Sequence, residues 1–166
     1  MENFNYNHRG RENTERLKEL THIDAKGKAK MVDVSAKPVQ QRAATARGEI
    51  RMAKETLRSI RRDKISKGNV LATARIAGIQ AAKRTGDLIP MCHPLPINHC
   101  EVEFEFPKAE NAIVITATAK VAAQTGVEME ALTAVNLAAL TIYDMCKAVD
   151  NRMRITNVKL VSKTKQ

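Results

Sequence analysis

Apolar and polar residues alternate one by one between residues 99 and 106. Such alternation is typical of a strand with one buried face, because successive side chains of a strand point to opposite sides. Residues 107–111 begin with a proline and predict a turn, and residues 112–121 then predict an antiparallel partner strand. The two faces of the first strand are Cys100, Val102, Phe104 and Phe106 toward a core, and His99, Glu101, Glu103 and Glu105 toward water.

The first half of the chain has less regular patterns. Residues 30–34 are apolar enough to predict a short strand. Residues 39–52 combine the alanine content of a helix with the alternation of a strand, and we favour a strand. Residues 53–62 and 70–84 predict two helices, because apolar residues recur there every three or four positions.

Particular residues mark the ends of the second helix. Asn69 is a candidate N-cap, and Gly86 is expected to end the helix. Residues 88–96 include three prolines within seven positions. Proline restricts its own backbone and that of the residue before it, so His93 is expected in a rigid, extended loop.

A long helix is predicted over residues 127–149, followed by a last strand over residues 154–162. The helix is apolar almost all the way round, so it belongs in a core or between subunits. It nevertheless carries Asp144 and Lys147, which are neighbours on one helix face. Charges on a buried helix are costly unless they are paired or needed, which makes this pair a functional candidate.

The order of these elements predicts the fold class. Two helices alternate with strands in a βαββαβ arrangement, which indicates an α+β, ferredoxin-like fold with an antiparallel sheet and helices on one face. Residues 1–19 are polar and show no apolar period, so we expect a flexible N-terminal tail. Residues 20–166 are expected to form a single catalytic domain.

The formal net charge of +10 is concentrated in parts of the chain. Residues 26–84 carry 16 Lys and Arg against four acids, whereas residues 85–146 carry two Lys against eight acids. A basic sector of this kind attracts anions, either nucleic acid or a small polyphosphate. Aromatic residues make up 3% of the chain, which is too few for a base-stacking surface, so a small polyphosphate is favoured.

The sequence also indicates where the protein works. It has neither the apolar run of a membrane span nor the apolar segment of a signal peptide at its start. Its three cysteines are an odd number and form no CxxC pair, which favours a reducing cytoplasm over a disulfide framework. We therefore expect a cytoplasmic protein without membrane contact.

Several residues could carry chemistry, and each has an alternative structural interpretation. His93 is either a hydrogen-bonded structural residue or a general acid–base group or phosphate donor. Asp144 and Lys147 are either a buried ion pair or an acid–base pair whose pKa values burial tunes, with desolvation lowering that of Lys147. Lys67, before a helix N-terminus, and Arg42, in a segment with few charges, could each bind an anion.

Other residues gave weaker indications. Glu128 and Glu130 either stabilise the long helix by interacting with the positive end of its dipole, or they bind a polar substrate. Cys92, His93, His99 and Cys100 are residue types that bind zinc, but their spacing fits no common zinc site. No metal site is therefore expected.

Six segments resemble the MoaC family, the cyclic pyranopterin monophosphate synthases of molybdenum cofactor biosynthesis, in register from about Leu20 to Lys163. The segments are Leu20–Ile23, Met31–Ser35, Ala72–Thr85, Leu88–Leu95, Gly126–Leu132 and Ile142–Val149. Two small departures, at Met91 and Asn69, remove no reactive group.

The resemblance implies a phosphorus–oxygen lyase that converts 3′,8-cyclo-7,8-dihydroguanosine 5′-triphosphate to cyclic pyranopterin monophosphate and releases pyrophosphate. It implies no metal or redox cofactor, and a homohexamer that is a trimer of dimers with active sites at the dimer interface. The alternative is a basic nucleic-acid-binding protein without catalytic activity, which the resemblance disfavours.

The resemblance also assigns roles to residues of this chain. It implies that the catalytic residues are Asp144, Lys147 and Lys67. The implied substrate-binding residues are Arg42, Met91, Cys92, His93, Glu128, Met129 and Glu130. We expect the lysines to transfer protons, while His93 and Arg42 orient the phosphates or the base of the substrate.

Overall fold

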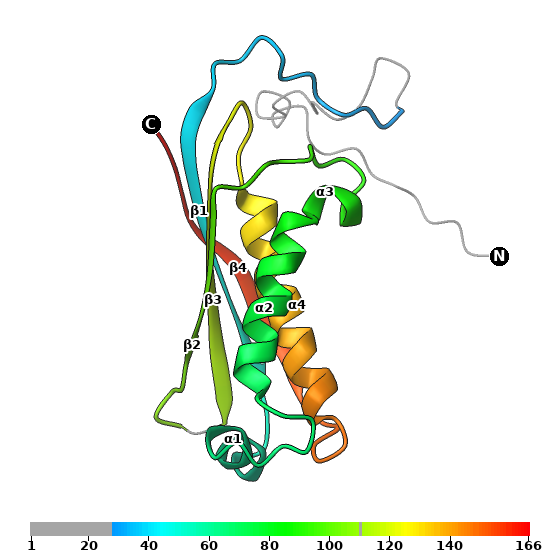
Figure 1. The fold of residues 1–166 in the computed structure, drawn as a ribbon, viewed down its shortest axis with the longest axis vertical. Helices are drawn as coiled ribbons and strands as arrows, with labels where there is room; N and C mark the ends of the chain where they lie inside the picture. Colours follow the sequence, from blue (N-terminus) through cyan, green and yellow to red (C-terminus); the bar gives the residue numbers. More distant parts are fainter. Residues whose placement is uncertain (1–27, 110) are drawn as a thin grey trace, which may run out of the picture. The chain divides into compact units, whose positions relative to one another are not determined.

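The computed structural model describes residues 28–109 and 111–166. The chain divides into two units, Met1–Val32 and Asp33–Gln166, and every described helix and strand belongs to the second unit (Figure 1). The tail predicted over residues 1–19 lies outside the described residues. Within the part of the chain that is described, no helix is long and apolar enough to cross a membrane.

The strand predicted over residues 30–34 is wrong, because these residues are irregular and lead into a turn. The Asp33 Oδ1 atom accepts hydrogen bonds from the Ser35 backbone N–H at 2.9 Å and from the Ser35 hydroxyl at 2.7 Å. The Lys37 N–H donates to the Val34 carbonyl at 2.9 Å. Such local hydrogen bonds compete with strand pairing and favour a turn.

Four antiparallel strands form one sheet in the order β2-β3-β1-β4. The ambiguous early segment is a strand, as predicted, and the final strand runs three residues further than predicted. The bounds are β1 Gln40–Arg51, β2 His99–Glu105, β3 Ala112–Ala123 and β4 Arg154–Lys165. The alternation of β2 is confirmed, since His99 is exposed while Cys100 is half-buried and Val102 is buried.

The helices follow the sequence pattern closely. Their bounds are α1 Lys54–Arg61, α2 Val70–Lys83, α3 Thr85–Leu88 and α4 Glu128–Cys146. The predicted N-cap is confirmed, because the Asn69 side chain accepts a hydrogen bond from the Ala72 N–H at 2.8 Å. The α+β class, with its antiparallel sheet, is therefore confirmed.

Gly86 does not end α2, contrary to the prediction, because it lies inside the short helix α3. The helix α2 ends at Lys83, and the Thr85 hydroxyl donates to the carbonyls of Ala81 and Ala82 at its end. A Cβ atom at Gly86 would lie 3.0 Å from the Pro94 Cα atom. Glycine at this position thus allows the proline loop to pack closely against α3.

The helices α2 and α4 pack side by side on one face of the sheet (Figure 1). Gly78 makes this possible, since a Cβ atom there would lie 2.9 Å from the Ala134 carbonyl oxygen. Between helices and sheet lies the apolar core, which includes Ile50, Ile113, Ile115, Val135 and Ile142. The small residue Gly78 of α2 thus allows close contact between the two helices.

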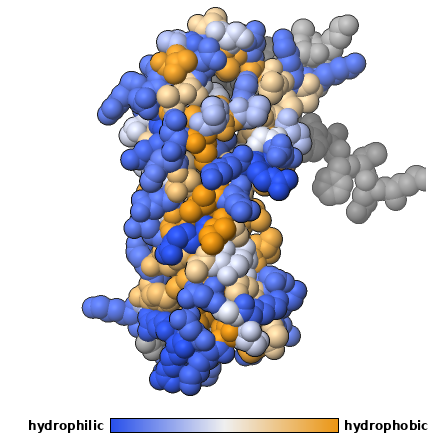
Figure 2. All heavy atoms as spheres, viewed as in Figure 1, coloured by the Kyte–Doolittle hydropathy of each residue, from blue (hydrophilic) through white to orange (hydrophobic). Residues whose placement is uncertain are grey.

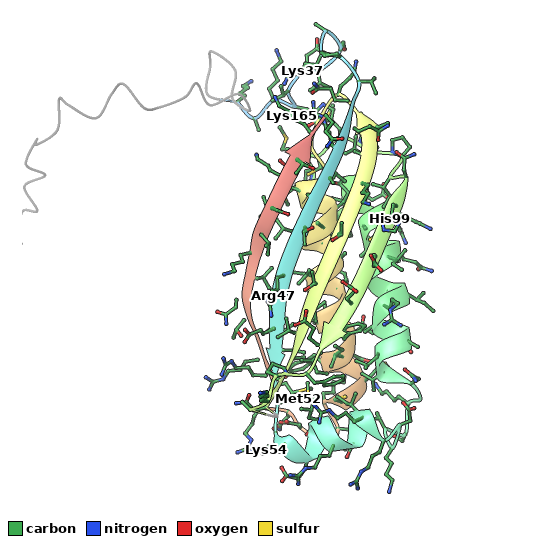
Figure 3. All side chains as sticks on the ribbon, turned by 90° about the vertical axis from the view of Figure 1, so that its left-hand side faces the viewer. Lys37, Arg47, Met52, Lys54, His99 and Lys165 are labelled. Carbon is green, nitrogen blue, oxygen red and sulfur yellow. The ribbon has the colours of Figure 1, made fainter. Side chains whose placement is uncertain are left out.

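The opposite face of the sheet carries polar side chains and no helix of the described chain (Figure 3). Arg47 of β1 and Glu105 of β2 lie on it, with an Arg47 Nη2 to Glu105 Oε2 distance of 3.6 Å. His99 lies on the same face, at the β2 edge of the sheet (Figure 3). The sheet is thus covered by helices on one side only.

Candidate active site

Lys67, Asp144 and Lys147 meet at the C-terminal end of α4. The Asp144 carboxylate accepts from the Lys147 Nζ atom at 2.7 Å and from the Lys67 Nζ atom at 3.0 Å. Lys67 Nζ also donates to the Asp144 backbone carbonyl at 3.0 Å. One carboxylate therefore holds two ammonium groups in fixed positions, and the structure brings together all three predicted catalytic residues.

Two local features place these side chains. Asp144 and Lys147 lie three residues apart at the end of α4, where helical geometry puts them on one face. Lys67 comes from the turn between α1 and α2, where Gly68 has a φ of +95° that favours glycine. The Lys67 ammonium group meets one of the last carbonyls of α4, where the helix dipole favours positive charge.

The charges of this cluster shift its pKa values. Hydrogen bonds from Lys147 and Lys67 lower the pKa of Asp144 to about 2. The Asp144 carboxylate raises the pKa of Lys147 above its ordinary value. At neutral pH, Asp144 is therefore ionised and Lys147 is protonated.

The prediction that burial tunes this pair is wrong for the single chain. The side chains of Asp144 and Lys147 are both 56% exposed, so the pair is neither a buried ion pair nor a desolvated one. The pKa of Lys147 moves up rather than down because its carboxylate partner outweighs desolvation. The exposed positions of α4 form one narrow stripe, namely Met129, Asn136, Leu140 and Asp144.

A second group of residues, which includes the predicted Arg42 and Glu128, lies at the other end of α4. Arg42, Gly126, Glu128, Lys163 and Lys165 line a cavity of about 360 Å³. The Glu128 Oε1 atom lies 3.2 Å from the Lys163 Nζ atom. The absence of a side chain at Gly126 makes room for the Glu128 carboxylate, which a Cβ atom there would strike.

Arg42 is held by the end of β3. Its Nε atom donates to the Ala123 carbonyl at 3.0 Å, and its Nη2 atom donates to the Gln124 carbonyl at 3.3 Å and to Gln40 Oε1 at 3.0 Å. These bonds keep the guanidinium group of Arg42 in the wall of the cavity. Arg42 and Glu128 therefore form one group, as their predicted roles require.

Glu130 and the proline loop lie near the same end of α4. Glu130 is 3% exposed, and burial raises the pKa of its carboxyl group. It lines a cavity of about 310 Å³ with Thr85–Asp87 and Pro94–Pro96, the residues that directly follow His93. Burial and the charge of Glu130 raise the pKa of the Cys92 thiol, which indicates that the two groups lie close together.

The two groups of residues are separated by the length of α4. Asp144 lies 16 positions after Glu128 in α4, which at the rise of an α-helix corresponds to about 24 Å. Figure 1 shows the two ends of α4 at opposite ends of the helical layer. The predicted site residues of one chain therefore form two half-sites rather than one pocket.

Lys163 and Lys165 were missed as site residues. A bulge in β4 shifts the register between Leu160, opposite Ala46, and Ser162, opposite Thr45. Lys163 then lies opposite the buried residue Ala44 and faces the helices. Spacing by two residues places Lys163 and Lys165 on one face, but the bulge that decides which face is a tertiary feature.

Chemically, the arrangement combines carboxylates with lysine and arginine cations. Among residues 28–109 and 111–166, no group of three His, Cys, Asp or Glu side chains could hold a metal ion. The protonated Lys147 ammonium can donate a proton or stabilise an oxyanion. The lysine and arginine groups suit an anionic substrate such as a phosphate ester.

Comparison with known proteins gives a consistent result. A family model described as the MoaC family matches residues 31–166. A cyclic pyranopterin monophosphate synthase from Parvibaculum lavamentivorans is 56% identical over 147 residues, which cover 89% of this chain and 92% of that protein. The protein of the same name from Chloroflexus aurantiacus is 58% identical over 145 residues, covering 87% of this chain and 89% of the relative.

A third relative, from a Roseiflexus species, carries the same name. It is 55% identical over 148 residues, which cover 89% of this chain and 94% of the relative. The residues that the family model matches include both ends of α4.

Proposed function

The chain belongs to the MoaC family, and from this premise we propose that it is a cyclic pyranopterin monophosphate synthase. The reaction converts 3′,8-cyclo-7,8-dihydroguanosine 5′-triphosphate to cyclic pyranopterin monophosphate and pyrophosphate, in molybdenum cofactor biosynthesis. The observation that carries the proposal is the Asp144 carboxylate between the ammonium groups of Lys67 and Lys147. The α+β topology, with strand order β2-β3-β1-β4, supports a ferredoxin-like arrangement.

The geometry suggests what each catalytic group does. Ionised Asp144 keeps Lys147 protonated, so Lys147 starts the reaction as a general acid or as a cation for the phosphate oxygens. Lys67 is oriented by two acceptors on one residue, the carboxylate and the carbonyl of Asp144. The proposed substrate-binding residues are Arg42, Met91, Cys92, His93, Glu128, Met129 and Glu130.

We propose that two copies of the chain complete each active site. The half-sites lie about 24 Å apart along α4, so one small substrate does not reach both in a single chain. A second copy packed antiparallel against the first would bring the Asp144 end of one chain to the Glu128 end of the other. Exposed apolar residues on the two main helices support such a contact, with Ile76 60% exposed and Leu140 52% exposed.

On the face shown in Figure 2, apolar side chains reach the surface among polar ones. We extend the proposal to a homohexamer built as a trimer of dimers, as the resemblance implies. We also propose a single catalytic domain over residues 20–166. A cytoplasmic location is supported by three free thiols, Cys92, Cys100 and Cys146.

Direct assay tests the function. The purified chain is incubated with the cyclic triphosphate intermediate, and both pyrophosphate and cyclic pyranopterin monophosphate are quantified against time. We expect equimolar formation of the two products, and loss of both when Lys147 is replaced by alanine. Salt-dependent binding to duplex DNA or RNA without turnover would instead favour the nucleic-acid-binding alternative.

A further inference from the structure

Three arginines line one cavity that the predicted active site does not include. Arg51 ends β1, Arg154 begins β4, and Arg152 lies in the turn before β4. Together with Asp150 and other residues they surround a space of about 330 Å³. That volume is within the range of small-ligand sites, about 300–1,000 Å³.

Two of these arginines are placed unfavourably for a chain without a ligand. Arg51 and Arg154 are direct cross-strand partners in the β1–β4 pair. Like charges directly opposite each other in an antiparallel pair are destabilising. Glu49 offsets part of the repulsion through an ion pair to Arg51 at 3.3 Å, with both groups partly exposed.

Asp150 is the one acid among the residues that line this cavity, and its carboxylate is hydrogen-bonded to other groups of the protein. Asp150 is 7% exposed and accepts from the Ala53 N–H at 2.8 Å, the Thr56 hydroxyl at 3.2 Å and the Arg152 N–H at 3.1 Å. These donors satisfy its carboxylate oxygens. The hydrogen bond from the Ala53 N–H lowers the pKa of Asp150 and the charge of Arg152 also lowers it, so Asp150 partly balances that guanidinium group. Arg152 and Arg154 both line the cavity and can bind an anion there.

The arginine cavity adjoins the catalytic lysine. A neighbouring cavity of about 270 Å³ is lined by Lys147, Ala148, Val149, Asp150, Asn151, Arg152 and Ala53. Arg152 and Asp150 line both cavities, so they form a shared wall. Positive groups thus continue from Lys147 through Arg152 to Arg51 and Arg154.

We propose that Arg51, Arg152 and Arg154 form a polyphosphate-binding site beside the active site. Arginine binds phosphate oxygens through paired N–H groups, and several arginines suit an anion with several charges. The choice of polyphosphate rests on the proposed function, since the reaction starts from a triphosphate and releases pyrophosphate. Binding itself requires no turnover.

Titration calorimetry with inorganic pyrophosphate and the full chain tests the site. We expect Arg152→Gln and Arg154→Gln each to weaken binding about three- to tenfold. Glu49→Gln removes the acid that competes for Arg51, so we expect it to tighten binding about twofold. Lys159→Gln, which removes one positive charge further along β4, is the matched control and should leave the affinity nearly unchanged.

An arginine variant that folds poorly would also bind pyrophosphate weakly. The Glu49→Gln variant excludes this explanation, because it is expected to bind pyrophosphate more tightly than the wild type. Unchanged affinity in all three cluster variants would overturn the proposal, as would no pyrophosphate binding at millimolar concentration. An effect of the cluster variants on duplex nucleic acid but not on pyrophosphate would also overturn it. Pyrophosphate binding that depends on the arginines in a chain without synthase activity would support this site and reject the proposed function.

Turnover measurements then distinguish the two sources of polyphosphate. If the site holds the triphosphate of the substrate, the arginine variants raise KM in the same proportion as the pyrophosphate Kd. If it holds released pyrophosphate, they raise the inhibition constant of added pyrophosphate while KM stays constant. Both results support a polyphosphate site.

Discussion

Lys67 Nζ lies 3.0 Å from both the carboxylate Oδ2 and the backbone carbonyl of Asp144, a residue 77 positions further along the chain. The lysine therefore contacts both the carboxylate of Asp144 and the end of the helix that carries this side chain. Its position is fixed by the turn before α2, and that of Asp144 by the last turn of α4. The packing of α2 against α4 therefore brings Lys67 to Asp144.

Replacing either lysine should abolish most of the activity. Because Lys67 and Lys147 are the proposed proton-transferring groups, Lys67→Ala and Lys147→Ala should each lower kcat by a factor on the order of 10²–10⁴. Lys64→Ala, an exposed lysine in the same loop as Lys67, is the control and should retain wild-type kcat. A Lys147→Ala enzyme with normal kcat would remove Lys147 from the mechanism.

The stability supplied by Asp144 should depend on pH. Its folded pKa of about 2 lies below its ordinary value of 3.8, so ionised Asp144 favours the folded chain. That contribution is complete above the ordinary value and disappears as the pH falls through about 2. The raised pKa of Lys147 acts in the other direction, because its contribution is complete below 10.5 and is lost at more alkaline pH.

Urea unfolding of the wild type and of Asp144→Asn at several pH values measures this dependence. We expect the difference between their midpoints to be largest near neutral pH and to vanish toward pH values of about 2. A direct titration of the Asp144 carboxyl group by NMR gives a second reading. Titration of Asp144 at its ordinary pKa would show that Lys67 and Lys147 do not stabilise its ionised form.

Two inactive variants should restore activity when they are mixed. His93→Ala damages one half-site and Lys147→Ala damages the other, so a mixed dimer contains one active site without either substitution. After joint unfolding and refolding of equal amounts, random pairing predicts about a quarter of the wild-type activity. The control mixture of Lys67→Ala with Lys147→Ala, both in one half-site, should stay inactive; equal recovery there would argue against shared sites.

Gly126→Ala should disturb the substrate side of the site. A Cβ atom at Gly126 would strike the Glu128 carboxylate and push it away from Lys163. We expect KM to rise, with kcat/KM lower by about a factor of ten. In a double-mutant cycle, Gly126→Ala should add little to Glu128→Gln, whereas fully additive effects would mean that Gly126 acts independently of Glu128.

Asp150→Ala should destabilise the chain without touching the active-site lysines directly. Asp150 supplies the acceptor for the Ala53 N–H at the start of α1, where Ala53 has no capping side chain of its own. Loss of a cap and of the Thr56 bond should cost about 1–3 kcal/mol of unfolding free energy. Asp87→Ala, which removes an exposed carboxylate paired with Arg84, is the control in denaturant unfolding and should change stability by less than about 0.5 kcal/mol.

Local patterns predicted most of the secondary structure. These patterns are the alternation in β2, the three- and four-residue spacing in α2 and the Asn69 cap. Each depends only on residues that are close together in the sequence, so it can be recognised without the tertiary structure. The two errors in secondary structure have different causes. Asp33 formed a turn in place of a strand, and Gly86 served a close contact with Pro94 instead of ending α2.

The resemblance to the MoaC family also identified most of the residues that gather at the two ends of α4, but not Lys163 and Lys165. The sequence by itself determined the strands, the helices and the types of reactive group, because these depend on short-range spacing and on residue chemistry. Only the tertiary structure decided that Lys67 meets Asp144 and that the bulge in β4 turns Lys163 toward Glu128. It also decided that α4 separates the half-sites and leaves Asp144 exposed, because long-range packing sets distance and burial whereas local spacing does not.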